Sequence, residues 1–365
     1  MKNILVICGP TASGKTSLAL SVAKELTERH SGLGPAAGTR RGKSTIPSLR
    51  GQPACRRSKI SCISRSGLTP SGSVNILSAD SRQIYQGLDI VTGKDIPADL
   101  PPNISFFGLD LVEPNQAYNL ADFVSYSQKI IQSSIKENVP LIIVGGTGLY
   151  LKAITSDLLN VHVPPNIDLR RDLERLDLKT LQSRLLELNP NKLASLNNSD
   201  LHNPRRLIRA IEISSSLRDS TSIDTPLEGT NQSNPSSLDR HASLTMTDIS
   251  FLWIGLHQDK EIQKAKIRQR VLDRLDYGAI EEVENLMIKY PNHRPPIFTS
   301  LGVQETSKFL HQEITRETLI HLWTASEIAY ARRQMVWFKK QPGIVWYDKS
   351  TIDSHLIAKL TEIYK

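Results

Sequence analysis

A chain of 365 residues is long enough to bury a large core and exceeds the usual size of one compact domain. Hydrophobic residues make up 39% and charged residues 22%, as in water-soluble globular enzymes, and no apolar run approaches the roughly 18 residues of a membrane span. These values exclude a membrane-spanning protein. The three cysteines, without metal-ligand spacing, argue against a disulfide framework and indicate a reducing, cytoplasmic setting.

The net charge of +8 comes from one segment, residues 31–72, which holds eight Lys or Arg residues and no acid. Bases and acids balance elsewhere, so overall basicity does not indicate that the folded body binds nucleic acid. The segment is rich in Gly, Pro, Ser and Arg and lacks periodicity. We therefore expect a disordered basic insertion, which is either a solvated loop or an electrostatic arm that collects an RNA.

An apolar strand is expected at residues 4–8, so early that no room is left for a signal peptide. It leads into a loop with the spacing G-x-x-x-x-G-K-[ST] and then into a helix at residues 16–30. In that context backbone N–H groups and the helix N-terminus converge on an anion, and Lys15 can reach the outer phosphate. We predict a phosphate or diphosphate site here rather than a glycine-rich turn without a ligand. Its residues are Gly9, Pro10, Thr11, Ala12, Ser13, Gly14, Lys15 and Thr16.

Strands alternate with helices in the next part of the chain. Short apolar runs predict strands at residues 74–78, 104–107 and 140–144, and apolar periodicity predicts a helix at 119–138. Strands that alternate with helices around a first phosphate loop indicate an α/β fold with a parallel, P-loop NTPase-like sheet.

Asp80 follows the predicted strand at 74–78, at the sheet edge where open α/β folds bind ligands. A carboxylate beside a phosphate loop can act as a general base or hold a metal through water; the alternative is a cap on the next helix. The strand at 140–144 ends in Gly-Gly-Thr without an acid. This disfavours an ATP hydrolase or an ordinary kinase and leaves open a reaction in which diphosphate is the leaving group.

Helices dominate after residue 163, and we predict three parts: a core at 1–163, an inserted helical lobe at 164–248, and a mostly helical return to the core at 249–365. A Ser/Thr-rich stretch at 214–248 is expected to be flexible. The further elements expected are helices at 167–176, 178–188, 204–214, 259–290, 300–310 and 315–340, and strands at 249–256 and 345–347.

Three basic clusters occur in this helical half. Arg205, Arg206 and Arg209 follow a proline at a helix start, which makes them candidates for phosphate contacts. The second cluster has five cations between residues 264 and 274, and the spacing of Lys266, Arg270 and Arg274 places these three on one helical face. The cations between residues 332 and 340 are expected on a solvated face.

Five motifs, in order along the chain, make this sequence similar to the tRNA dimethylallyltransferases. They are Gly-Pro-Thr-Ala-Ser-Gly-Lys-Thr at 9–16, Ser-Ala-Asp-Ser-Arg-Gln-Ile-Tyr at 78–85, Gly-Leu-Asp-Ile-Val-Thr-Gly-Lys at 87–94, Val-Gly-Gly-Thr-Gly-Leu-Tyr at 144–150 and Asn-Pro-Arg-Arg-Leu-Ile-Arg-Ala-Ile-Glu at 203–212. The resemblance implies transfer of a dimethylallyl group from dimethylallyl diphosphate to N6 of adenosine 37, next to the anticodon of tRNA. It also implies Mg²⁺ as cofactor and a cytoplasmic monomer without membrane contact.

The resemblance further implies roles for single residues. Asp80 matches the general base, and Lys15, Thr147 and Arg270 match the other catalytic positions, with Thr16 nearest the Mg²⁺. The residues implied to contact tRNA are Asp80, Ser81, Arg82, Gln83 and Thr147 around the flipped base, and Arg170, Arg205, Arg206, Leu207, Ile208 and Arg209 in the lobe.

The chain departs from this family pattern in the segments at 31–72 and 214–248, and at Val303 and Gln304, where the family usually has Tyr and a cation. The alternatives are an adenylate isopentenyltransferase acting on free AMP, ADP or ATP, a small-molecule P-loop kinase, and a non-enzymatic RNA-binding protein. The basic residues of the helical lobe favour tRNA over a free nucleotide.

Overall fold

The structure is a computed structural model that describes residues 2–30, 72–97, 99–156, 163–221, 249–291 and 296–364. The predicted insertion at 31–72, apart from its last residue, and most of the stretch at 214–248 lie outside these residues. The chain divides into two compact units. The core unit combines Met1–Ser156 with Leu244–Lys365, and the helical unit comprises Asp157–Ser243.

One six-stranded sheet forms the centre of the core unit, in the order β3-β2-β4-β1-β5-β6 with every neighbouring pair parallel. The strands are β1 (Lys2–Cys8), β2 (Val74–Ser78), β3 (Ile104–Phe107), β4 (Leu141–Gly145), β5 (Ile249–His257) and β6 (Ile344–Asp348). The register pairs Cys8 with both Gly145 and Gly255, and Ser78 with Val144. The carboxyl ends of these strands therefore meet at one edge, and the predicted α/β parallel sheet is confirmed.

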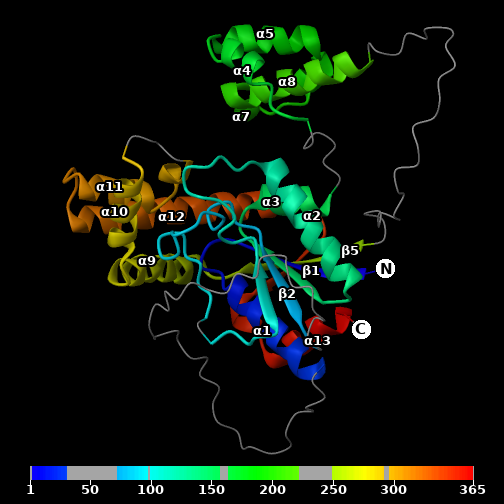
Figure 1. The fold of residues 1–365 in the computed structure, drawn as a ribbon, viewed down its shortest axis with the longest axis vertical. Coiled ribbons are helices and arrows are strands. Elements are labelled where there is room, and N and C mark those ends of the chain that lie inside the picture. The colour runs from blue at the N-terminus through cyan, green and yellow to red at the C-terminus, as the bar shows by residue number, and fades with distance from the viewer. Residues whose placement is uncertain are drawn as a thin grey trace, which may run out of the picture. The chain divides into compact units, whose positions relative to one another are not determined.

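In addition to α2 and α3, two groups of helices pack on the core unit, and Figure 1 shows these two groups on different sides of the strands. In the first group α1 and α13 lie side by side and bury Leu18, Val22 and Leu356 against the sheet. In the second group α9 to α12 enclose a separate apolar cluster around Trp323, whose side chain is fully buried. The helices of this unit are α1 (Lys15–His30), α2 (Leu120–Lys136), α3 (Gly148–Thr155), α9 (Lys260–Asp276), α10 (Ala279–Lys289), α11 (Val303–Leu310), α12 (Arg316–Phe338), α13 (Ser354–Thr361) and the 3₁₀ turns η2 (Pro296–Thr299), η3 (Lys349–Thr351) and η4 (Glu362–Tyr364).

The helical unit has its own small core, formed by leucine and isoleucine side chains of α4, α5 and α8 such as Leu173, Leu185 and Ile211. Its helices are α4 (Ile167–Leu173), α5 (Leu178–Leu188), α6 (Pro190–Ala194), α7 (Asn198–Leu201) and α8 (Pro204–Thr221). Among the described residues, no helix has both the length and the apolar character needed to cross a membrane.

Two predicted boundaries are wrong. The single helix expected at 259–290 is two helices, because Gly278 adopts φ +100° and a left-handed residue cannot continue a right-handed helix. The helix expected to end at residue 214 continues as α8 to Thr221, so residues 214–221 of the stretch expected to be flexible are helical. The Ser214 side chain is buried and accepts a hydrogen bond from Asn189 Nδ2 at 3.4 Å. This serine is therefore part of the packed helical unit and not of a linker.

Gly278 and Gly302 allow a test of how closely the Trp323 cluster is packed. Both have positive φ, so alanine costs about 1–2 kcal/mol at either site from backbone strain. A Cβ on Gly302 would also lie 2.5 Å from the Trp323 ring, whereas a Cβ on Gly278 meets nothing closer than 3.5 Å. We expect Gly302→Ala to lower the free energy of unfolding by roughly 3 kcal/mol and Gly278→Ala by about 1 kcal/mol. Urea unfolding followed by tryptophan fluorescence measures both, since all four tryptophans lie in the core unit. Equal losses in the two variants would show that the cluster has room for the extra methyl group.

Candidate active site

The phosphate loop leaves β1 at the carboxyl edge of the sheet and passes very close to β5. A Cβ on Gly9 would lie 2.5 Å from the carbonyl oxygen of Leu256, and Gly9 has φ +142°, so this position requires glycine. The Thr11 N–H donates to Gln334 Oε1 at 2.8 Å, and Gln334 Nε2 donates to the Gly146 carbonyl at 2.9 Å. Gln334 of α12 thus ties the phosphate loop to the turn after β4.

Lys15 is the first residue of α1, and its Nζ donates to the Pro10 carbonyl at 2.6 Å. Burial of the ammonium group, together with the nearby positive charge of Arg270, lowers the pKa of Lys15 to about 8, although Asp80 partly opposes this shift. The Ser13 hydroxyl is fully buried and has no hydrogen-bond partner within the described residues. The Lys15 ammonium group and the unpaired Ser13 hydroxyl suit this loop to bind an anion.

Asp80 lies directly after β2, at the same edge of the sheet. Its Oδ1 accepts a hydrogen bond from the Arg82 N–H at 2.9 Å and so closes a turn at residues 81–84, whereas no α-helix starts there. The alternative interpretation of Asp80 as a helix cap is therefore wrong, and the carboxylate stands on a rigid turn next to the phosphate loop.

Thr147, at the start of α3, holds the turn that carries Asp80. The Ser81 N–H donates to Thr147 Oγ1 at 3.1 Å, and the Gln83 side chain donates to the Gly93 carbonyl at 2.8 Å. Burial, reinforced by the negative charge of Asp80, raises the pKa of the neighbouring Tyr330 hydroxyl to about 12, so it stays a neutral phenol. Thr147 and Gln83 thus fix the segment after β2 from two sides.

Arg270 of α9 is oriented by Asp95, whose Oδ2 lies 2.7 Å from Arg270 Nη2. Burial alone would lower the pKa of Arg270, but the carboxylates of Asp95 and Glu327 outweigh it, and the net shift is upward. The guanidinium group therefore stays charged while it is held in a fixed direction.

These groups line one cavity of about 300 Å³ at the carboxyl edge of the sheet. The predicted site residues found in its lining are Thr11, Ala12, Lys15, Thr16, Asp80, Ser81, Arg82, Gln83 and Arg270. The lining carries five cationic side chains, Lys15, Arg82, Arg270, Arg274 and Arg333, and three carboxylates, Asp80, Asp95 and Glu327. An excess of positive charge in a partly enclosed cavity favours an anionic ligand with several charges.

Helix α12 supplies cavity residues that were not predicted as site residues, among them Glu327, Tyr330 and Gln334. The lining also includes Arg333, which is exposed like the other cations of its cluster and borders the cavity. One signal was present in the sequence: polar Glu327 and Gln334 lie in register with buried Trp323 and Phe338 on the apolar stripe of the helix. Polar residues on a buried stripe need partners, which the cavity provides.

The segment that departs from the family pattern also lies at this cavity. Thr299, Ser300 and Leu301 line it, whereas Val303 is buried in the Trp323 cluster and Gln304 is exposed. The two replaced side chains therefore do not reach the cavity lining.

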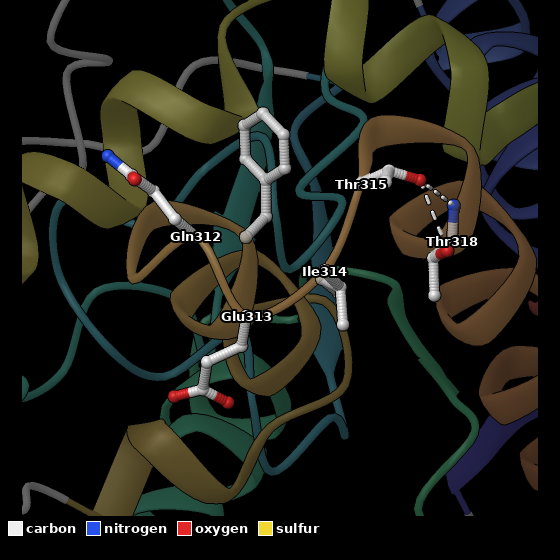
Figure 2. Close-up of a pocket in the computed structure, with 6 residues that line it drawn as sticks. Gln312, Glu313, Ile314, Thr315 and Thr318 are labelled. Atoms are coloured by element: carbon white, nitrogen blue, oxygen red, sulfur yellow. Dashed lines mark hydrogen bonds between the residues drawn. The ribbon is translucent and has the colours of Figure 1, made fainter.

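A second hollow, of about 460 Å³, lies at the turn between α11 and α12 (Figure 2). Figure 2 shows Thr315 and Thr318 joined by hydrogen bonds, and Gln312 and Glu313 pointing in different directions. Its lining includes one carboxylate and no cation. The lining of this hollow therefore lacks the cationic side chains that suit the cavity at the sheet edge to an anionic ligand.

In the helical unit, Glu212 organises two of the arginines that the sequence links to tRNA. Its side chain is buried and accepts hydrogen bonds from Arg170 and Arg209 and from the Asn166 N–H. Burial raises the pKa of Glu212, but these hydrogen bonds outweigh it and the net shift is downward. Both arginines are thus held in defined positions while remaining about one-third exposed.

The other lobe residues differ in exposure. Arg205 is exposed, and Arg206 forms an ion pair with Asp200. Leu207 and Ile208 are buried in the core of the helical unit, so their side chains are not available to an RNA. These two side chains stabilise α8, and the polar face of the helix carries the arginines.

The cavity fits Mg²⁺ only as a partner of a phosphate ligand. Among the described residues, no group of three His, Cys, Asp or Glu side chains could hold a metal ion. The Thr16 hydroxyl and the Asp80 carboxylate, both hard oxygen donors, line the same cavity. Mg²⁺ typically uses one or two such protein oxygens together with water and substrate phosphates.

Comparison with known proteins agrees with this geometry. The model of the IPP transferase family matches residues 83–341. The tRNA dimethylallyltransferases of Acaryochloris marina and Trichormus variabilis are each 30% identical, over 96% and 97% of this chain and 94% and 96% of their own lengths.

Solved structures share the fold. The full-length tRNA isopentenylpyrophosphate transferase of Bacillus halodurans superposes with a TM-score of 0.60 at 21% identity, covering 99% of this chain and 95% of its own. A eukaryotic dimethylallyltransferase acting on tRNA superposes with a TM-score of 0.68 at 18% identity, covering 99% and 78%. From the family match and the extent of the similarity, we conclude that this chain belongs to the IPP transferase family.

Proposed function

We propose that this protein transfers a dimethylallyl group from dimethylallyl diphosphate to N6 of adenosine 37 of tRNA and releases diphosphate. The observation that carries the proposal is that Lys15, Asp80 and Arg270 line one cavity. A base and two diphosphate-binding cations are the groups that this reaction needs. Membership of the IPP transferase family supports the same assignment.

Asp80 is the general base in this proposal. The exocyclic amine of adenine is a poor nucleophile, so a carboxylate that accepts its proton lowers the barrier as the bond forms. The nitrogen attacks C1 of the dimethylallyl group, the C1–O bond breaks, and its electron pair leaves with the diphosphate. The proton that N6 loses passes to Asp80. The turn closed by Asp80 and Arg82, and held by Thr147, keeps the carboxylate in place.

Lys15, Arg270 and the backbone N–H groups of the phosphate loop bind the diphosphate and stabilise the charge that grows on it as it leaves. Mg²⁺, with Thr16 as its protein ligand, would supply further positive charge to the diphosphate. Ser81, Arg82 and Gln83 surround the adenine, which must leave its stack in the anticodon loop to enter a cavity.

The helical unit is the tRNA-binding lobe of the proposal. Arg170, Arg205, Arg206 and Arg209 would contact phosphates of the anticodon stem-loop, and such contacts position an RNA without reading its sequence. We further propose that the enzyme acts as a cytoplasmic monomer.

The test of the function is transfer of label from dimethylallyl diphosphate to unmodified tRNA in the presence of Mg²⁺, with AMP, ADP and ATP as parallel acceptors. We expect label in tRNA at adenosine 37 and none in the free nucleotides. Label in the nucleotides alone would identify an adenylate isopentenyltransferase instead.

Replacing Asp80 with Asn tests the base. The amide oxygen can still accept the Arg82 N–H, so the turn should survive, but the side chain can no longer take a proton. We expect the single-turnover rate to fall by roughly 100- to 10,000-fold, with the affinities for tRNA and diphosphate little changed. An unchanged single-turnover rate would remove Asp80 from this role.

Lys15 predicts a pH dependence of diphosphate binding. Its pKa is lowered to about 8 and only the protonated amine attracts the anion, so the affinity for diphosphate, taken relative to that of Lys15→Arg, should be level below pH 8. Above pH 8 it should fall by up to about tenfold per pH unit. Calorimetric titration with inorganic diphosphate across this range measures the profile, and Lys15→Arg is the control because its guanidinium stays charged. Parallel profiles in the two proteins would show that another group titrates.

A further inference from the structure

Two arginines of α9, Arg270 and Arg274, converge on a single glycine of the cavity. They lie one helical turn apart, and both line the cavity. Gly93 has φ +66°, and a Cβ there would overlap Arg274 Nη2 and lie 3.0 Å from Arg270 Nη2. Gly93 therefore makes room for the ends of two guanidinium groups at the same point.

Arg274 is held rigidly from two sides. Its Nη1 lies 3.1 Å from Glu327 Oε1, and each of these two side chains is only 10% exposed. The guanidinium carbon also lies 5.9 Å from the ring centroid of Trp323, within the range of a cation–π contact. Burial and the adjacent Arg270 lower the pKa of Arg274, and Glu327 opposes that shift.

The ion pair with Glu327 engages one guanidinium nitrogen of Arg274 among the described residues. Arg274 is 8% exposed, yet its Nε has no hydrogen-bond partner within the described residues. The hydrogen bond it donates there runs from Nη1 to one oxygen of Glu327, rather than from two nitrogens as a forked pair would. A buried, unpaired donor is costly unless a ligand completes it.

We propose that Arg274 is a second guanidinium group that binds the diphosphate of the prenyl donor together with Arg270, and that Glu327 is the residue that positions it. The inference rests on the proposed function, because it names a further residue for the same substrate. Arg274 shares the cavity lining with Lys15 and Thr16 of the phosphate loop. A diphosphate has enough charge and enough oxygens for an ammonium and two guanidinium groups, and the guanidinium fork matches phosphate geometry.

The decisive variant is the double substitution Arg274→Met with Glu327→Met. Removing Arg274 alone would leave Glu327 buried without its partner and could destabilise the fold, whereas removing both charges keeps the volume filled and leaves no unpaired carboxylate. We expect thermal stability close to that of the unchanged protein. We also expect a roughly ten- to hundredfold loss of affinity for inorganic diphosphate with Mg²⁺, measured by calorimetry, and a similar rise in KM for dimethylallyl diphosphate.

Two further variants keep the inference testable. Arg268→Met removes a cation from the exposed face of the same helix, so diphosphate affinity should not change. Arg274→Lys keeps the charge and the partner but loses the fork, so diphosphate affinity should fall about tenfold while the fold is retained. If the double variant does not fold, the diphosphate affinity of Arg274→Lys tests the inference instead.

Diphosphate affinity in the double variant equal to that of Arg268→Met would overturn the inference and leave Arg274 a structural residue. Retained diphosphate affinity with weakened tRNA binding would also overturn it, by assigning Arg274 to the RNA. Failure of the proposed function is seen separately, as an unchanged protein that prenylates no tRNA, while diphosphate binding still reports on Arg274.

Discussion

The close approach of backbone at the carboxyl edge of the sheet is the constraint on which the site depends. Parallel pairing places the ends of β1, β2 and β4 at one level, so the loops that follow them must share a small space. A Cβ on Gly9 would meet β5, and a Cβ on Gly145 would overlap the Ala79 carbonyl. Glycine at these positions lets the phosphate loop, the Asp80 turn and the start of α3 meet around one cavity.

Charge in this cavity is arranged by ion pairs among its lining residues, of which Arg274–Glu327 is buried and Arg270–Asp95 is partly exposed. Asp95 orients Arg270 and Glu327 orients Arg274, so each guanidinium keeps a fixed direction. Burial of the Lys15 ammonium group lowers its pKa most, and the positive charge of Arg270 lowers it further. A polyanionic ligand relieves the repulsion between the cationic side chains of the cavity. The clustering of these cations therefore destabilises the folded protein without ligand and strengthens ligand binding.

The helical unit shows how a contiguous motif divides between structure and function. Residues 205–209 lie on one helix, and with 3.6 residues per turn they cannot all face the same way. Leu207 and Ile208 face the small core, while Arg205 is exposed and Arg209 is held by Glu212. The sequence motif includes residues of both faces of the helix. One face packs against the core of the helical unit, and the other face is open to a ligand.

The sequence by itself determined the strands, the phosphate loop, the position of Asp80 at the sheet edge and the family resemblance, because these depend on patterns within a few neighbouring residues. Only the tertiary structure decided that α12 lines the cavity and that Arg274 pairs with Glu327, 53 residues away. It also decided where the helix at 259–290 breaks, since the left-handed conformation of Gly278 accompanies the packing of α9 and α10 around one cluster. Contacts between residues distant in sequence arise from packing of whole elements. Polar positions on the buried stripe of α12 indicate that this helix needs polar partners, but they do not say which ones.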